Sequence, residues 1–117
     1  MVENQVTVEQ RKDSSWLIAL AGEHDLSTMP VLEAAVEQVF AQGTTILVDL
    51  SDTAFIDSTT LGTLIRAQQR ADTNPGERLV LVAPPDSAAE RIIDVTGTRS
   101  MLRIYDTRAK ADEALRT

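Results

Sequence analysis

Apolar residues run almost without a break from Ile46 to Leu50. Such a run predicts a β-strand that is buried on both faces of a sheet. The polar segment 51–54 predicts a short turn, and the apolar pair Phe55-Ile56 then leads into a helix that begins at Asp57-Ser58. Hydroxyl and carboxylate groups therefore gather at the N-terminus of a helix, which is a place that favours anions.

The N-terminal part of the chain predicts a β-hairpin. Val6 and Val8 alternate with polar residues, which is typical of a strand at the edge of a sheet. Residues 11–14 predict the turn, and the more apolar segment 15–21 predicts a longer and more buried second strand. Residues 22–26 then predict a loop.

Two helices flank the central strand. The first has suitable N-caps in Ser27 and Thr28 and a proline in its first turn, Pro30. Its apolar face follows helical spacing through Leu32, Ala35, Val36, Val39 and Phe40. Gly43 predicts a left-handed terminator. The second helix is predicted over 58–72, with an inner face made of Leu61, Leu64 and Ile65.

The rest of the chain predicts two further strand and helix units. Residues 78–83 predict a buried strand, and Ser87-Ala88-Ala89-Glu90 fits a capping box at the start of a third helix. We expect that helix to end at Gly97 and to bury Ile92, Ile93 and Val95. Residues 101–105 predict a short last strand, and Thr107 can cap a final helix.

The predicted order of elements is β-β-α-β-α-β-α-β-α. Strands that alternate with helices after a hairpin predict an α/β fold with a mixed, mostly parallel sheet and an antiparallel pair at one edge. A length of 117 residues fits one domain, which we expect to span residues 1–117.

Composition narrows the function. The net charge of −7 disfavours nucleic acid and anionic membranes as partners, and 3% aromatic residues leave little for stacking on bases or sugars. The chain has no cysteine and one histidine, His24, so we expect no metal, no cofactor and no Ser-His-Asp triad. No signal peptide or membrane span is visible, so we expect a cytoplasmic protein whose partner is another protein.

Asp57 and Ser58 admit two interpretations. Both residue types are preferred N-caps, so either side chain can simply accept a free backbone N–H of the helix. Alternatively, Ser58 is exposed and accepts a phosphoryl group, whose charge of about −1.5 to −2 the helix N-terminus favours and the Asp57 carboxylate opposes. Thr59 and Thr60 are further hydroxyl-bearing residues in the same turn, and each stays open as an alternative phosphoacceptor.

No pattern along the chain indicates catalysis. Ser58 has no nearby histidine or lysine to act as a base, and neither a Gly-x-Ser-x-Gly elbow nor a glycine-rich phosphate-binding motif occurs. We therefore expect no catalytic residue and no enzyme activity. His24 is interpreted as solvated in its loop, and Asp25 as either a turn residue or a group with a role at the surface.

Three segments resemble the STAS domain family, and specifically its stand-alone bacterial anti-sigma factor antagonists. Residues 20–26, Leu-Ala-Gly-Glu-His-Asp-Leu, are similar to the family's strand ending in Gly-Glu-x-Asp. Residues 48–51 together with 55–62 resemble its strand, loop and phosphorylation helix. The family's C-terminal third is similar to residues 92–97, 102–105 and 113–115.

The resemblance implies a STAS fold and a partner-switching cycle. The unmodified protein would bind an anti-sigma factor that is also a serine kinase, and would thereby free a sigma factor for transcription. That kinase would phosphorylate Ser58 and cause release, and a Ser/Thr phosphatase would reset the antagonist. By position, the resemblance assigns partner binding to Glu23, Asp25, Asp57, Ser58 and Thr59. We expect a monomer or a weak homodimer.

Two positions depart from the family pattern. Thr60 stands where the family often has glycine, so we expect its branched side chain to add bulk where a kinase approaches. His24 stands in the contact loop where the family usually has an apolar residue, so the partner can differ. Two alternatives stay open, namely a non-switching STAS scaffold in a transport or stress-sensing complex, and a sensor that binds a small anion or nucleotide at the helix start.

Overall fold

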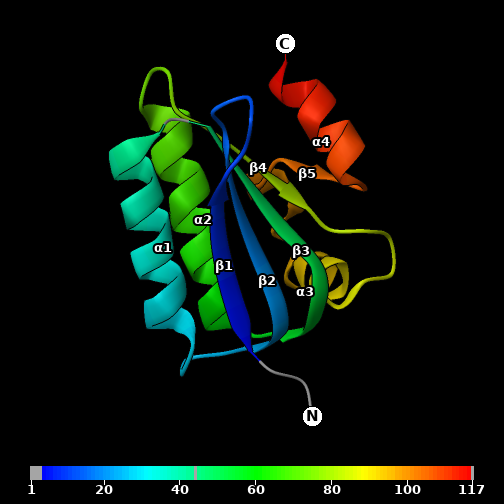
Figure 1. The fold of residues 1–117 in the computed structure, drawn as a ribbon. Helices are drawn as coiled ribbons and strands as arrows, with labels where there is room; N and C mark the ends of the chain where they lie inside the picture. The colour runs from blue at the N-terminus through cyan, green and yellow to red at the C-terminus, as the bar shows by residue number, and fades with distance from the viewer. Residues whose placement is uncertain (1–3, 44, 117) are drawn as a thin grey trace.

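The computed structural model describes residues 4–43 and 45–116. Its centre is a five-stranded sheet of order β1-β2-β3-β4-β5 (Figure 1). β1 and β2 pair antiparallel, and the other neighbouring strands pair parallel. The predicted α/β fold with a hairpin at one edge is confirmed. The elements are β1 Gln5–Gln10, β2 Trp16–His24, α1 Met29–Gln42, β3 Thr45–Ile56, α2 Ser58–Thr73, β4 Arg78–Val82, α3 Ala88–Thr96, the 3₁₀ helix η1 Arg99–Met101, β5 Ile104–Tyr105 and α4 Arg108–Leu115.

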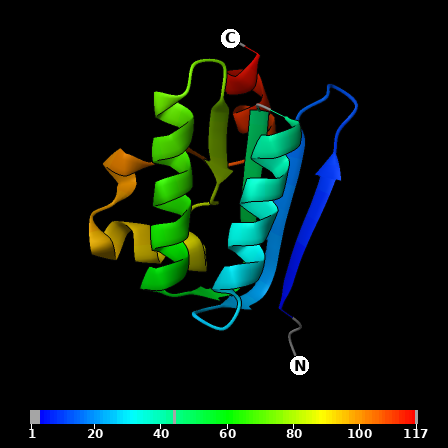
Figure 2. The ribbon, with the colours of Figure 1, turned by 90° about the vertical axis from the view of Figure 1, so that its left-hand side faces the viewer.

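Helices cover the two faces of the sheet unequally. α1 and α2 stand side by side against one face, and α4 lies on the other (Figure 2). The main hydrophobic core joins inward side chains of α1, α2 and α3 to the sheet. A smaller cluster lies under α4 and is formed by Leu17, Leu47, Val80, Val82 and Ala111. β3 is central, and its residues 46–50 are buried, as predicted for a strand covered on both faces.

The central strand is longer than predicted. β3 continues through 51–54, so the interpretation of this segment as a turn is wrong. β2 also extends beyond its predicted end, and after irregularities in register the pairing closes at His24 and Ile56. Polar residues are tolerated here because they bond locally, as when the Thr53 hydroxyl donates to the Leu50 carbonyl at 2.7 Å. The two strands consequently end side by side, directly before α2.

Gly43 ends α1 for a reason other than the predicted one. Its φ of −155° is extended, so the expected left-handed terminator is wrong. A Cβ atom at this position would lie 2.4 Å from the indole Nε1 of Trp16. Glycine is therefore needed because it lets the backbone pass close to the Trp16 ring.

The caps of α3 and α4 are confirmed. The Ser87 hydroxyl accepts the Glu90 backbone N–H at 3.1 Å, and Gly97 ends α3 with a left-handed φ of 70°. The Thr107 hydroxyl accepts the Lys110 backbone N–H, also at 3.1 Å. The last strand is shorter than predicted because the segment before it folds into η1. Within the described ranges, no helix is both long and apolar enough to cross a bilayer.

Ion pairs fasten α4 to the sheet. Arg108 Nε lies 2.6 Å from Oδ2 of Asp49, which is a largely buried residue of β3. Burial alone would raise the pKa of Asp49, but hydrogen bonds from Ser51 and Arg108 outweigh it, and the pKa is lowered. A second pair joins Arg11 Nη1 to Asp112 Oδ1 at 2.8 Å. α4 is therefore anchored near its start and towards its end.

Candidate functional site

The helix start singled out by the sequence lies where two parallel strands end. β2 ends at His24, β3 ends at Ile56, and the Asp57 backbone N–H donates to the His24 carbonyl at 3.1 Å. Sites in open α/β sheets gather beyond the carboxyl ends of the parallel strands. The five predicted partner-binding residues lie at or directly after these two strand ends: Glu23, Asp25, Asp57, Ser58 and Thr59.

Asp57 is the N-cap of α2. Its Oδ1 accepts the Thr60 backbone N–H at 2.9 Å and the Thr59 hydroxyl at 2.8 Å. Slight burial acts to raise the pKa of Asp57, but these hydrogen bonds outweigh it and lower the pKa. The carboxylate is therefore ionised at neutral pH. The first interpretation of the Asp57-Ser58 pair, a helix cap, is therefore correct for Asp57.

Ser58 is left free by this arrangement. It is the first residue of α2 and is exposed, and its hydroxyl makes no hydrogen bond to any residue that the structure describes. Backbone N–H groups in the first turn of a helix lack intrahelical partners, and an added anion is favoured there. The Ser58 hydroxyl is thus accessible and uncommitted.

The two threonines that follow Ser58 differ from it and from each other. Thr59 is exposed, but its hydroxyl already donates to Asp57. Thr60 is only 1% exposed, and its Oγ1 is buried without a hydrogen-bond partner among the described residues. The expected bulk of Thr60 on the partner-facing surface is therefore wrong, because the side chain points into the protein. Of the three hydroxyls, only that of Ser58 is both exposed and uncommitted.

His24 is a buried residue of β2, so its interpretation as a solvated loop residue is wrong. It is 1% exposed, with Nε2 lying 2.9 Å from the Ala21 carbonyl oxygen. Its Nδ1 lies 3.2 Å from Oγ1 of Thr28, the residue before α1. The imidazole therefore ties the end of β2 to the start of α1. It shapes the connection that carries Asp25 without facing a partner itself.

Ionised carboxylates lie near Ser58. Oδ1 of Asp25 accepts the hydroxyl of Ser27 at 2.5 Å and its backbone N–H at 2.9 Å, and these bonds lower the pKa of Asp25. The negative charge of Asp57 acts in the opposite direction on that pKa, because the two carboxylates are close. Glu23 is exposed and lies opposite Phe55 across the strand pair. This end of the molecule is accordingly acidic.

Apolar side chains at the same end were not predicted as part of the site. Leu26 is 63% exposed, Phe55 is 50% exposed and Val95 is 85% exposed. The predicted burial of Val95 is wrong, because α3 buries Ala89 and Ile93 instead. No sequence signal separates the exposed Phe55 from the buried Ile56, because burial along 51–56 does not follow the period-2 alternation of a strand.

A shallow groove of about 330 Å³ connects Phe55 to Val95 between β3 and α3. On α3 its wall is formed by Ala88, Ile92 and Val95, which are spaced i, i+4 and i+7, together with the exposed Arg91. Leu26 belongs to the same region, because its backbone N–H helps to lower the pKa of the Asp57 carboxylate. We define the Ser58 surface as the exposed or half-buried residues of this end: Glu23, Asp25, Leu26, Phe55, Asp57, Ser58, Thr59 and Val95.

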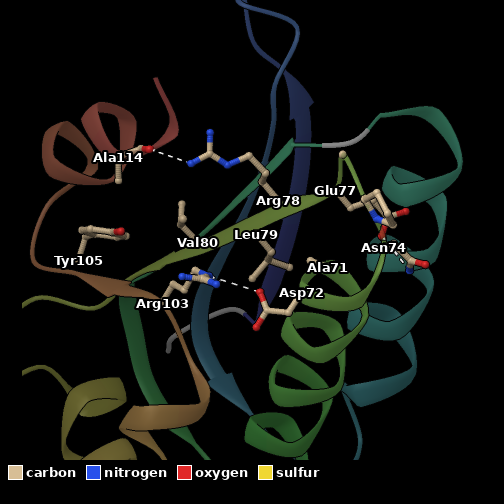
Figure 3. Close-up of a pocket in the computed structure, with 12 residues that line it drawn as sticks. Ala71, Asp72, Asn74, Glu77, Arg78, Leu79, Val80, Arg103, Tyr105 and Ala114 are labelled. Atoms are coloured by element: carbon tan, nitrogen blue, oxygen red, sulfur yellow. Dashed lines mark hydrogen bonds and ion pairs between the residues drawn. The ribbon is translucent and has the colours of Figure 1, made fainter. Parts of the chain in front are cut away.

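A larger pocket of about 540 Å³ lies at the other end of α2, where β4 begins (Figure 3). Its arginines are already engaged in the fold. Arg103 Nε lies 3.3 Å from Asp72 Oδ1, and Arg78 donates to the backbone carbonyls of Leu115 at 2.7 Å and Ala114 at 2.8 Å. Arg78 thereby closes the C-terminal end of α4 and Arg103 is paired with α2, so the Ser58 surface remains the better candidate for function.

Comparisons with known proteins agree with this geometry. Among solved structures, an anti-sigma factor antagonist from Mycobacterium paratuberculosis is 28% identical, with a TM-score of 0.87 over 98% of this chain and 96% of that chain. The antagonist SpoIIAA in its unphosphorylated form is 20% identical, with a TM-score of 0.75 over 96% of each chain. The Bacillus SpoIIAA in its phosphorylated form is 19% identical, with a TM-score of 0.69 over 95% of this chain and 99% of that chain.

A search of curated proteins found no significant match. A family model described as "Mlab, STAS domain" matches residues 7–106, which is most of the chain. The matched region runs from β1 to the end of β5 and includes the Ser58 surface. The chain therefore belongs to the STAS domain family.

Proposed function

We propose that this STAS domain is an anti-sigma factor antagonist that acts by partner switching, with Ser58 as its phosphoacceptor. The observation that carries the proposal is the exposed and uncommitted Ser58 hydroxyl, next to an Asp57 carboxylate that already caps the helix. The likeness to the M. paratuberculosis antagonist supports the class of function. SpoIIAA, which shares the fold, has been solved in both an unphosphorylated and a phosphorylated form.

In the proposed modification, Ser58 Oγ attacks the γ-phosphorus of ATP held by a kinase partner. The bond between the γ-phosphorus and ADP breaks, and the hydroxyl proton passes to a base on the kinase. This chain contributes the acceptor hydroxyl and no catalytic group, because the kinase brings the nucleotide and its Mg²⁺. His24 is unsuited to act as the base, since it is buried with both ring nitrogens near oxygen atoms of the fold.

The phosphate is expected to change binding more than folding. At the first position of α2 the backbone N–H groups favour the new charge, while the ionised Asp57 and Asp25 oppose it, so the two effects on the fold partly cancel. In a complex the same charge loses its water. It then lies beside the ionised carboxylates of Asp57 and Asp25, and their repulsion penalises the bound state.

The Ser58 surface fits a partner patch that is both apolar and basic. Leu26, Phe55 and Val95 offer apolar contact, and the acidic side chains around Ser58 favour lysine or arginine on the other side. We assign this patch to an anti-sigma factor with serine kinase activity, and the reset to a Ser/Thr phosphatase. In this proposal the chain is a regulator rather than an enzyme and acts in the cytoplasm.

Capture from a lysate of the source cells tests this assignment. We expect immobilised wild-type protein to retain an ATPase with serine kinase activity, and the Ser58→Asp variant to lose it. A Ser58→Ala variant keeps the surface neutral and should retain the same partner. Equal capture by the wild type and Ser58→Asp would contradict switching and would support a fixed scaffold. A rise in Tm of the isolated chain with phosphate or nucleotide would instead indicate an anion sensor.

A further inference from the structure

The strand β1 leaves one edge of the sheet open. Among the described residues it pairs with β2 alone, through six consecutive residue pairs without a bulge (Figure 2). Natural edge strands are usually protected by lysine, proline, a bulge or a covering element. β1 reads Gln-Val-Thr-Val-Glu-Gln, so Glu9 is its one charged residue and it contains neither lysine nor proline. This edge is available for pairing with another strand.

An apolar groove accompanies this open edge. It has a volume of about 460 Å³ and lies between β1 and α1. Val8 is 38% exposed and Val31 is 56% exposed, which makes two of the six large hydrophobic side chains exposed in the described part of the chain. The other lining residues are mostly small or apolar: Val6, Pro30, Ala34, Ala35 and Gln38. The groove is separate from the Ser58 surface and does not depend on the function proposed above.

We propose that a second copy of this chain covers the groove, through antiparallel pairing of the two β1 strands around a twofold axis at Thr7. In this register Val6 lies opposite the partner's Val8, so valine faces valine twice on the groove side of the sheet. On the other side Glu9 lies opposite the partner's Gln5, so that a carboxylate faces an amide. The strand is therefore complementary to itself in sequence as well as in backbone.

Other registers are less favourable. With Val8 on the axis, Val6 would face the partner's Gln10 and Thr7 would face the partner's Glu9. A shift by one residue would turn the valines of one copy to the face opposite those of the other, because side chains alternate along a strand. Of these registers, the one centred on Thr7 pairs valine with valine twice on the side of the sheet that carries the two α1 helices.

In this dimer the two five-stranded sheets join into one ten-stranded sheet. The twofold axis reverses the strand direction between the copies, so the two Ser58 surfaces point in opposite directions along the strands. Both surfaces stay open, so each copy can engage a partner. Each copy also carries a net charge of −7, so the copies repel one another at long range. We therefore expect the dimer to become tighter as salt is added, because salt screens this repulsion while apolar burial remains.

Single-cysteine variants test the register, since the natural chain has no cysteine. Residues directly opposite in an antiparallel pair have Cα atoms about 4.5–5.5 Å apart, which is within the range of a disulfide. In the proposed register, oxidised Thr7→Cys forms a covalent dimer rapidly. Val8→Cys forms little, because two residues of offset place the Val8 Cα atoms about 8 Å apart, beyond disulfide reach.

Sedimentation equilibrium of the full chain provides the second measurement. Val8→Lys should weaken self-association about tenfold or more, because the dimer would then bury two ammonium groups in the groove. Val95→Lys is the matched control, since it places the same charge on an exposed valine outside the groove, and it should leave self-association unchanged. Circular dichroism checks that both variants fold. A wild type that stays monomeric at all concentrations, or cross-linking through Val8→Cys in place of Thr7→Cys, would overturn the proposal.

Discussion

Replacing Ser58 by aspartate is expected to weaken binding to the kinase partner by about thirtyfold or more, since an unpaired charge buried in an interface costs about 2 kcal/mol or more. The fold should survive. Ser58 is exposed at the first position of α2, and its hydroxyl makes no hydrogen bond to a described residue that the substitution would break. We expect the free energy of unfolding to change by less than about 0.5 kcal/mol, as for most surface substitutions.

Two control variants test whether binding is weakened by a negative charge at position 58 in particular, or by any added negative charge on α2. Ser58→Ala should bind like the wild type, because it removes the hydroxyl without adding charge. Gln69→Glu adds a negative charge on an exposed residue of the same helix, five residues before its cap at Asn74, and should also bind normally. Isothermal titration calorimetry with the captured kinase measures all four proteins. Equal affinity of Ser58→Asp and wild type would show that Ser58 lies outside the interface.

Replacing Gln68 by leucine is expected to destabilise the fold by about 1–3 kcal/mol or more, because the buried Leu79 carbonyl would lose its hydrogen-bond partner and the part-buried Arg103 N–H would lose one as well. Gln68 lies on α2 and is 1% exposed. Its Nε2 donates to the Leu79 carbonyl at 3.0 Å, and its Oε1 accepts the Arg103 backbone N–H at 3.2 Å. The amide thereby links α2 to β4 and to the segment before β5.

The reason for this role is the shortness of β5. Leu81 donates its backbone N–H to the Arg103 carbonyl, on the β5 side of β4. Leu79 is two residues earlier, so its backbone groups face the same side, but β5 begins only opposite Leu81. Gln68 therefore provides a hydrogen bond that a longer β5 would have supplied.

The neighbouring Gln69 is a matched control for Gln68. It is exposed, so Gln69→Leu should change the free energy of unfolding by less than about 0.5 kcal/mol in urea titrations. Gln68→Leu has a similar side-chain volume and leaves the helix propensity nearly unchanged, so its effect reports the lost hydrogen bonds. A Gln68→Leu variant as stable as Gln69→Leu would contradict this account.

The element order was predictable because apolar periodicity and caps act locally. The hairpin, the central strand and the caps at Ser87 and Thr107 all depend on residues that are close in sequence. The strand at 51–54 was missed because its composition is that of a turn, while pairing with β2 keeps it extended. Local propensity gave way there to tertiary context.

The site was predictable in position and less so in detail. The residues at 57–58 indicated a helix start with a hydroxyl and a carboxylate, but spacing alone could not show which of the two is the cap. The inward orientation of Thr60 and the burial of His24 depend on packing that spacing does not show, and His24 also contacts Thr28 across the connection to α1. The exposure of Val95 depends on which stripe of α3 meets the sheet, and its neighbours Ile92 and Ile93 left that choice open.

We expect Ser58 to be the residue whose phosphorylation switches binding. Mass-spectrometric mapping of phosphate on the purified chain, after incubation with the captured kinase and Mg-ATP, tests this expectation most directly. We expect a single phosphate on Ser58, with dissociation of the complex as the phosphate accumulates. A chain that stays unmodified while the kinase is active, or that carries its phosphate on Thr59 with Ser58 untouched, would contradict it.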